Sequence, residues 1–224
     1  MLGEVNIVDI KSTLYRLVPS CFPPIDLFET DDEVDAFLLA ELEGKTNDRL
    51  RNELGDLNLV PPEHRLSGSG ATPVMAAFTH VGNNNRFNGP DIGAYYAGLD
   101  VSTAIEESRF HRGIFLAASN ETPLKLDMRC YINNLVEPVQ SLFSTDYAQY
   151  LTSSTDYSLS QSFAMKRRNE GIAGFHYPSI RHKDGQCIVA FRPNALTPTK
   201  QGSHYQYVWD GKTISEIYEL TRKA

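Results

Sequence analysis

The chain has 224 residues, 41% of them hydrophobic and 10% aromatic, so it can bury a sizeable core. This excludes bulk disorder and a disulfide-stapled miniprotein. The 21 lysines and arginines against 28 aspartates and glutamates give a net charge of −7, so the chain lacks the broad positive surface of a nucleic-acid-binding protein.

Three scattered cysteines without a CxxC pair favour reduced thiols in a cytoplasmic protein and indicate no zinc site. No segment approaches the roughly 18 consecutive apolar residues that a membrane helix needs, and we expect neither a signal peptide nor a membrane anchor. The six histidines show no metal-binding spacing, so no metal site is expected.

The first third of the chain is expected to be mainly helical. The acids at 31–33 start a predicted helix that ends at Gly44, and a second predicted helix runs from Thr46 to Gly55. The run Ser67–Gly70 then predicts a flexible connector within one domain, because compact patterning resumes directly after it.

The rest of the chain alternates between predicted strands and helices. Five strands are predicted from short apolar runs or from apolar–polar alternation: 73–79, 93–97, 124–132, 172–177 and 187–191. One helix is expected from about Val101, with Asp100 or Ser102 as its N-cap, and another over Ser158–Glu170. The Asp-Gly pair at 210–211 predicts the turn of a terminal hairpin.

Helices and strands are mixed without a βαβ rhythm, and the sequence has no internal repeat. This pattern predicts a single α+β domain, 1–224, with a central mixed, largely antiparallel sheet flanked by helices. We expect residues 1–70 to form a mainly helical N-terminal part and residues 71–220 to contain the sheet.

The most informative segment for function is a glycine- and asparagine-rich loop followed by a strand and a helix. Arg86 in this loop could grip a phosphate, although a single arginine in such a loop is more often solvated. On the helix, Glu107 borders the apolar face, whereas Glu106 is rotated by about 100° toward solvent. Glu107 is therefore a candidate site residue, and the alternative is an ordinary surface acid.

Two other residues are candidates on weaker grounds. Arg16 lies in an apolar stretch, which suits either a paired buried arginine or a ligand contact. Ser179 follows the expected end of a strand, where functional side chains often lie on a rigid support. No GxSxG motif surrounds it, so a nucleophilic serine is not expected, and the alternative is a hydroxyl that bonds a turn amide. The chain also lacks the GxGxxG and GxxxxGK[ST] nucleotide motifs.

Taken in order, these segments resemble the RES domain family, which is named for its Arg, Glu and Ser. Residues 86–88, 93–97 and 102–107 resemble the family's arginine, its YxA strand and its TAxxE helix. Residues 172–181 resemble its G-I-x-Y-P-S-x-R segment, and the likeness runs over about 16–193. This chain offers Tyr95 beside Tyr96 and Glu106 beside Glu107, and the register favours the second residue of each pair.

The resemblance implies a fold similar to that of ADP-ribosyltransferases and a toxin that consumes NAD, neutralised by an Xre-type helix-turn-helix antitoxin. NAD would be the substrate, with no cofactor and no direct contact to nucleic acid. The implied catalytic residues are Glu107, Arg86 and Ser179, and the implied substrate-binding residues are Arg16, Tyr96 and Arg86.

We expect residues 71–220 to form the catalytic core. The reaction that the resemblance implies is cleavage of the nicotinamide–ribose bond, with water or phosphate as the acceptor, through an oxocarbenium-like transition state. Glu107 would steady the ribose cation, the arginines would hold the pyrophosphate, Tyr96 would stack on nicotinamide and Ser179 would bond the substrate. The alternatives are an ADP-ribosyltransferase that modifies a cellular protein and a non-catalytic module that only binds a partner.

Overall fold

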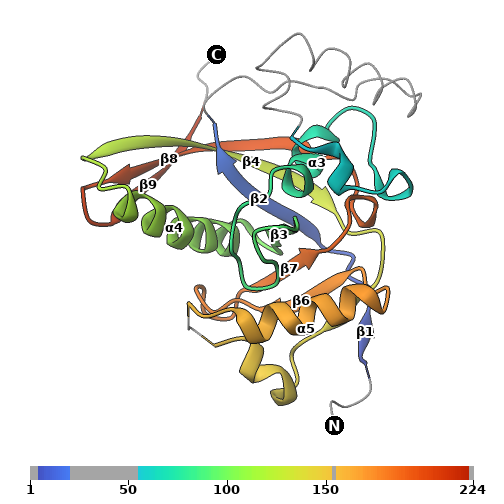
Figure 1. The fold of residues 1–224 in the computed structure, drawn as a ribbon. Helices are drawn as coiled ribbons and strands as arrows, with labels where there is room; N and C mark the ends of the chain where they lie inside the picture. Colours follow the sequence, from blue (N-terminus) through green and yellow to red (C-terminus); the bar gives the residue numbers. More distant parts are fainter. Residues whose placement is uncertain (1–4, 21–54, 153–154, 222–224) are drawn as a thin grey trace.

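The computed structural model describes residues 5–20, 55–152 and 155–221, and its fold is drawn in Figure 1. Cys21 and the two helices predicted before Gly55 lie outside these residues. The described strands are β1 (Ile7–Val8), β2 (Thr13–Pro19), β3 (Tyr95–Gly98), β4 (Leu124–Asn134), β5 (Val139–Ser141), β6 (Gly174–Pro178), β7 (Gln186–Ala190), β8 (Lys200–Trp209) and β9 (Ile214–Leu220). The described α-helices are α3 (Thr72–Thr79), α4 (Val101–Ala118) and α5 (Ser158–Asn169).

The strands form one sheet in the order β1-β5-β6-β7-β3-β2-β4-β8-β9. β5 and β6 pair in parallel, and the other pairs of neighbours are antiparallel. The predicted hairpin at 210–211 is confirmed as the connection between β8 and β9. The prediction of an α+β fold with a mixed, largely antiparallel sheet is therefore confirmed.

The sheet opens between β2 and β3. These two strands share a single register pair, Tyr15 with Gly98. β2 instead pairs along its whole length with β4, and all four residues of β3 pair with β7. Two well-paired halves therefore meet at a short seam and separate beyond it.

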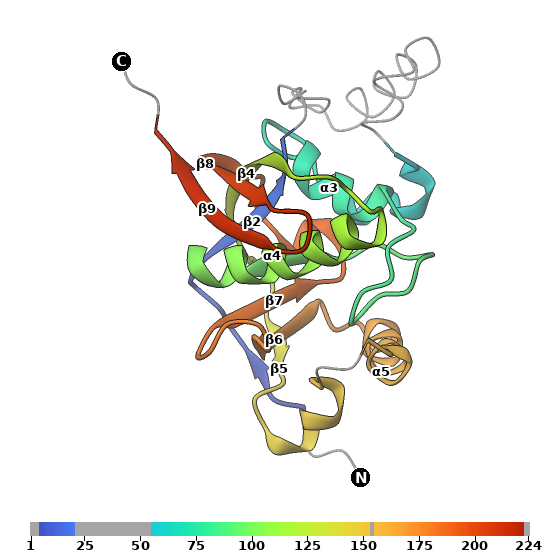
Figure 2. The same ribbon diagram turned by 90° about the vertical axis from the view of Figure 1, so that its left-hand side faces the viewer.

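Helix α4 begins as the sequence predicts, with Asp100 as its N-cap. The Asp100 carboxylate accepts a hydrogen bond from the Thr103 backbone N–H at 2.7 Å. The helix packs against β2 and β3 and contributes Ala104 and Leu116 to an apolar cluster with Trp209 of β8. Figure 1 and Figure 2 both show it between the β8–β9 hairpin and β7. Because it contacts both halves of the sheet, α4 covers the seam from one side.

The predicted strand at 73–79 is wrong, because this segment forms α3. Pro73 lies in the first turn, where its missing N–H removes no helical hydrogen bond. The buried side chains of Val74, Met75, Phe78 and Thr79 follow the one- and four-residue spacing of a helix face. An apolar run this short is ambiguous between strand and helix until its packing partner is known.

The sheet is not confined to residues 71–220. β1 and β2 come from the N-terminal part, and β2 lies in the interior of the sheet. The described residues between 55 and 70 carry two one-turn 3-10 helices, η1 (Leu57–Leu59) and η2 (Pro62–His64). The strand β2 was not predicted because its sequence, TLYRLVP, shows no strict alternation of apolar and polar residues that would mark a strand.

Within the described ranges, no helix combines the length and the apolar character needed to cross a bilayer. Of the three cysteines, Cys130 and Cys187 are buried free thiols.

Candidate active site

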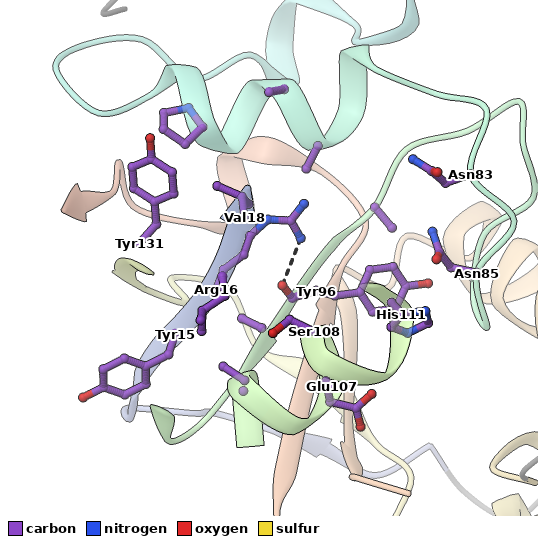
Figure 3. Close-up of a pocket in the computed structure, with 18 of the residues that line it drawn as sticks. Tyr15, Arg16, Val18, Asn83, Asn85, Tyr96, Glu107, Ser108, His111 and Tyr131 are labelled. Atoms are coloured by element: carbon purple, nitrogen blue, oxygen red, sulfur yellow. Dashed lines mark hydrogen bonds between the residues drawn. The ribbon is translucent and has the colours of Figure 1, made fainter. Parts of the chain in front are cut away.

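A cavity of about 1090 Å³ lies where β2 and β3 separate. Residues 15–19 of β2 line it, and so do residues 93–94 and 96–98 at and before β3. Side chains of α3 and α4 complete its walls, as the close-up in Figure 3 shows. Four of the five site residues predicted from the sequence line this cavity: Arg16, Arg86, Tyr96 and Glu107.

The Glu107 carboxylate is half-buried in the cavity wall, and only one of its oxygens is engaged. Oε1 accepts a hydrogen bond from the Ser179 hydroxyl at 2.6 Å and a weak one from the Cys187 thiol at 3.7 Å. Within the described ranges, Oε2 accepts no hydrogen bond. Glu107 is thus held in place through one oxygen and offers the other to a ligand.

Ser179 lies behind Glu107 rather than in the cavity lining. Its Oγ accepts hydrogen bonds from the backbone N–H groups of Arg181 at 3.1 Å and His182 at 3.0 Å, and it donates its own proton to Glu107. The turn-amide bonding considered from the sequence is therefore present. In this arrangement Ser179 orients the carboxylate.

Arg86 is presented by a loop whose backbone is held from several sides. The Asn88 side-chain amide donates to the carbonyls of Asn83, Gly89 and Ile92 within the loop. From α5, the Gln161 side-chain amide donates to the Asn84 side chain and to the carbonyls of Asn85 and Asn88 at 2.6–3.1 Å. The loop is thereby fixed to both the sheet and α5.

The Arg86 guanidinium is only partly engaged by this arrangement. Its Nη1 donates to the Tyr150 carbonyl at 3.1 Å, and the group lies over the Tyr157 ring at 5.1 Å from the centroid. The other guanidinium nitrogens of Arg86 have no hydrogen-bond partner in the ranges that the structure covers. They remain available to an anion in the cavity.

The two adjacent tyrosines point to opposite faces of β3, as strand geometry requires. Tyr96 lines the cavity, whereas Tyr95 is fully buried in the core and donates its hydroxyl to Asn133 at 3.2 Å. The Tyr96 hydroxyl donates to the Asn88 side chain at 2.8 Å and accepts from the Phe87 N–H at 3.0 Å. Burial raises the pKa of Tyr96, which keeps this hydroxyl protonated.

Arg16 reaches across the open seam. Its Nη1 donates to the Tyr96 carbonyl at 3.0 Å (Figure 3). Its guanidinium lies 4.7 Å from the centroid of the Tyr95 ring. Desolvation lowers the pKa of Arg16, and its buried Nε has no hydrogen-bond partner in the described part of the chain. Of the two alternatives drawn from the sequence, the pairing is present through the Tyr96 carbonyl and the Tyr95 ring, and Arg16 also lines the cavity, so a ligand contact stays a prediction.

The structure also brings to the cavity residues that were assigned no role from the sequence. His111 and Arg112 come from α4 and Arg181 from the segment after β6. The Arg181 guanidinium lies over the Phe110 ring, 3.4 Å from its centroid. The signal that could have revealed His111 is its spacing of four residues from Glu107, which places both on one face of a helix.

Replacing Tyr96 with phenylalanine is expected to lower the free energy of unfolding by about 1–3 kcal/mol, because the Phe87 N–H and the Asn88 side chain lose a partner. Urea denaturation measures this loss. Tyr157→Phe is the matched control, since its hydroxyl has no hydrogen bond to any described residue, and its unfolding free energy should stay at the wild-type value. Equal losses in the two variants would contradict the role given to the Tyr96 hydroxyl.

Three comparisons relate the chain to known proteins. A crystal structure of the M. tuberculosis MbcT–MbcA toxin–antitoxin complex contains a chain that aligns over 92% of this chain and 87% of its own length, with a TM-score of 0.46 and 12% identity. This likeness is too weak to support a conclusion. The chain is 33% identical over 218 residues to the uncharacterized protein y4oC of Sinorhizobium fredii (strain NBRC 101917 / NGR234). This alignment covers 94% of this chain and 89% of the relative. The RES domain model matches residues 62–210, so the chain belongs to the RES domain family.

Proposed function

We propose that this protein cleaves the bond between nicotinamide and ribose in NAD, with water or phosphate as the acceptor. The observation that carries the proposal is the Glu107 carboxylate at the cavity, which Ser179 orients through Oε1 and whose Oε2 accepts no hydrogen bond from the described residues. Breaking this bond builds positive charge on the ribose, and a fixed carboxylate beside the sugar stabilises that charge.

The size of the cavity supports a ligand as large as a dinucleotide. Pockets for small molecules and cofactors usually enclose roughly 300–1,000 Å³, and this cavity of about 1090 Å³ is at the upper end. Its lining includes residues of β2, β3 and α4, so a ligand of this size can contact several elements at once.

The charges of the cavity support a ligand that carries phosphate. Arg86, Arg112 and Arg181 all line it, close enough that each acts electrostatically on the His111 ring. Within the described residues, the Arg181 guanidinium makes no ion pair and no hydrogen bond. The guanidinium groups of Arg86 and Arg181 keep donors that bond no described residue, and such donors match the oxygens of a diphosphate.

In the proposed reaction, the C–N bond breaks and its electron pair leaves with nicotinamide. Glu107 stabilises the ribose cation, and the acceptor then bonds to the same carbon. Arg86 holds the diphosphate from the loop side, Arg16 contributes from β2, and Tyr96 offers its ring face to nicotinamide.

We further propose that the protein is a toxin held inactive by an Xre-type helix-turn-helix antitoxin. This rests on the resemblance to the RES family. If it is right, expression of the wild-type chain alone arrests growth and lowers cellular NAD, and co-expression of a helix-turn-helix protein encoded beside it restores both. A wild-type chain that cells tolerate alone, with normal NAD, would count against the toxin proposal.

The direct test of the reaction follows free nicotinamide after mixing pure protein with NAD, in phosphate buffer and in a phosphate-free buffer. The expected result is steady release by the wild type, with ADP-ribose as the partner product in water and a phosphorylated ADP-ribose when phosphate is the acceptor. If the wild type releases nicotinamide no faster than the Glu107→Gln variant, the proposed reaction is wrong.

A further inference from the structure

His111 is a cavity residue that the proposed reaction leaves without a role. It projects from α4 one turn after Glu107, and Figure 3 shows both side chains on this helix at the cavity. Residues four apart on a helix lie on the same face, so the imidazole and the carboxylate border the same part of the space. The His111 side chain remains accessible to solvent, although the groups around it partly desolvate the ring, and the Phe110 ring packs edge-on against it at 5.4 Å between centroids.

The imidazole is held neutral by its surroundings. Desolvation is the largest cause that lowers the pKa of His111, and the positive charges of Arg181, Arg112 and Arg86 lower it further. The Glu107 carboxylate opposes this, but the net direction is downward. These groups face His111 from α4, from the segment after β6 and from the loop before β3. A neutral imidazole has a lone pair that can accept a proton at neutral pH.

Neither ring nitrogen of His111 makes a hydrogen bond to any residue in the ranges 5–20, 55–152 and 155–221. Other cavity side chains of similar chemistry are occupied: Ser108 bonds the Tyr207 hydroxyl at 2.6 Å, and the Tyr96 hydroxyl is bonded twice. His111 is thus a free proton acceptor next to the carboxylate that the reaction uses.

We propose that His111 is a further catalytic residue, which accepts the proton of the water that captures the ribose cation. The inference rests on the proposed function. The nicotinamide–ribose bond breaks with its electron pair going to nicotinamide, and the water oxygen bonds to the ribose carbon. The water proton passes to the His111 lone pair and then to solvent, so the products are nicotinamide, ADP-ribose and a proton.

This role makes His111 necessary only for acceptors that must lose a proton. Azide is an anion that carries no proton at neutral pH, so it can capture the same cation without a base. The fate of the cation, divided between water and azide, therefore reports on His111 independently of the bond-breaking step that Glu107 serves.

The experiment incubates wild type and His111→Gln with NAD in phosphate-free buffer containing azide, and quantifies nicotinamide, ADP-ribose and the azide adduct. The expected result is a loss of ADP-ribose formation by roughly tenfold to a hundredfold in the variant, with formation of the azide adduct largely retained. His80→Gln, at the α3 end of the same cavity, is the control and should leave the product ratio unchanged.

A pH profile gives a second readout that a structural role would not move. Protonated His111 cannot accept a proton, so wild-type ADP-ribose formation should fall as the pH drops through its lowered pKa and be level above it. The His111→Gln profile should lack this step, and His111→Asn replaces it if the glutamine variant does not fold.

The outcomes separate the two proposals. An unchanged product ratio and an unchanged pH profile in a folded His111 variant overturn the role of His111 while nicotinamide release by the wild type still supports the reaction. A wild type that releases no nicotinamide overturns both.

Discussion

Glu107→Gln is expected to lower kcat for nicotinamide release roughly a hundredfold to a thousandfold, with a much smaller change in KM. Glutamine keeps the size and the hydrogen-bonding capacity of the side chain but removes the charge. Charge on the ribose is largest in the transition state, so its loss affects turnover more than binding. Initial rates over a range of NAD concentrations measure the two constants separately.

The neighbouring acid provides a matched control. Glu106 forms an ion pair with Arg109 at 3.5 Å on the exposed side of α4 and is not among the cavity residues. Glu106→Gln makes the same chemical change one position away and is expected to keep kcat within about twofold, because exposed pairs contribute little. Similar losses of kcat in both variants would show that the site depends on the helix rather than on Glu107.

We expect Gly93→Ala to lower the free energy of unfolding by about 3 kcal/mol, the largest of the stability effects that we predict. A Cβ at Gly93 would lie 2.3 Å from the Phe78 Cα and 2.5 Å from the Ala77 carbonyl oxygen. Both are backbone atoms of α3, so relief requires the helix to move away from the segment that leads into β3. Urea denaturation of the purified variant measures the loss.

Gly113→Ala is the control for this glycine. A Cβ at Gly113 would meet no atom within 4 Å, and the residue lies inside α4, where alanine is the better helix former. We expect a gain of roughly 0.5–1 kcal/mol in the free energy of unfolding. A loss from Gly93→Ala no larger than the scatter of surface variants would mean that α3 does not pack tightly on the sheet.

Features set by local sequence could be predicted. The N-cap Asp100, the helix after it and the Asp-Gly hairpin each depend on a few adjacent residues, and all three are confirmed. The choice of Glu107 over Glu106 also follows from local periodicity, since successive positions on a helix point in known directions. The choice of Tyr96 over Tyr95 comes from the register of the family resemblance. The structure places both favoured residues at the cavity.

Features that depend on distant partners could not be predicted. The segment that forms α3 is apolar enough for either secondary structure, and the η1 and β3 residues on which it packs are not adjacent to it in sequence. The position of Ser179 behind Glu107 joins residues 72 apart in sequence, and no spacing rule reveals it. The cavity lies where β2 and β3 separate, because β2 pairs mainly with β4 and β3 pairs mainly with β7. Only the complete strand order shows this.

Because the seam between β2 and β3 is short, a ligand in the cavity should affect how firmly the two halves of the sheet are held together. One register pair, the Arg16 bond to the Tyr96 carbonyl and the α4 packing join the two halves there. A ligand that contacts both halves of the sheet must be released before they can separate, so its binding free energy adds to the free energy of unfolding. At the same ligand concentration, an intact dinucleotide should therefore raise the midpoint of thermal unfolding more than either mononucleotide half, because contacts to both halves of the sheet give it the lower dissociation constant.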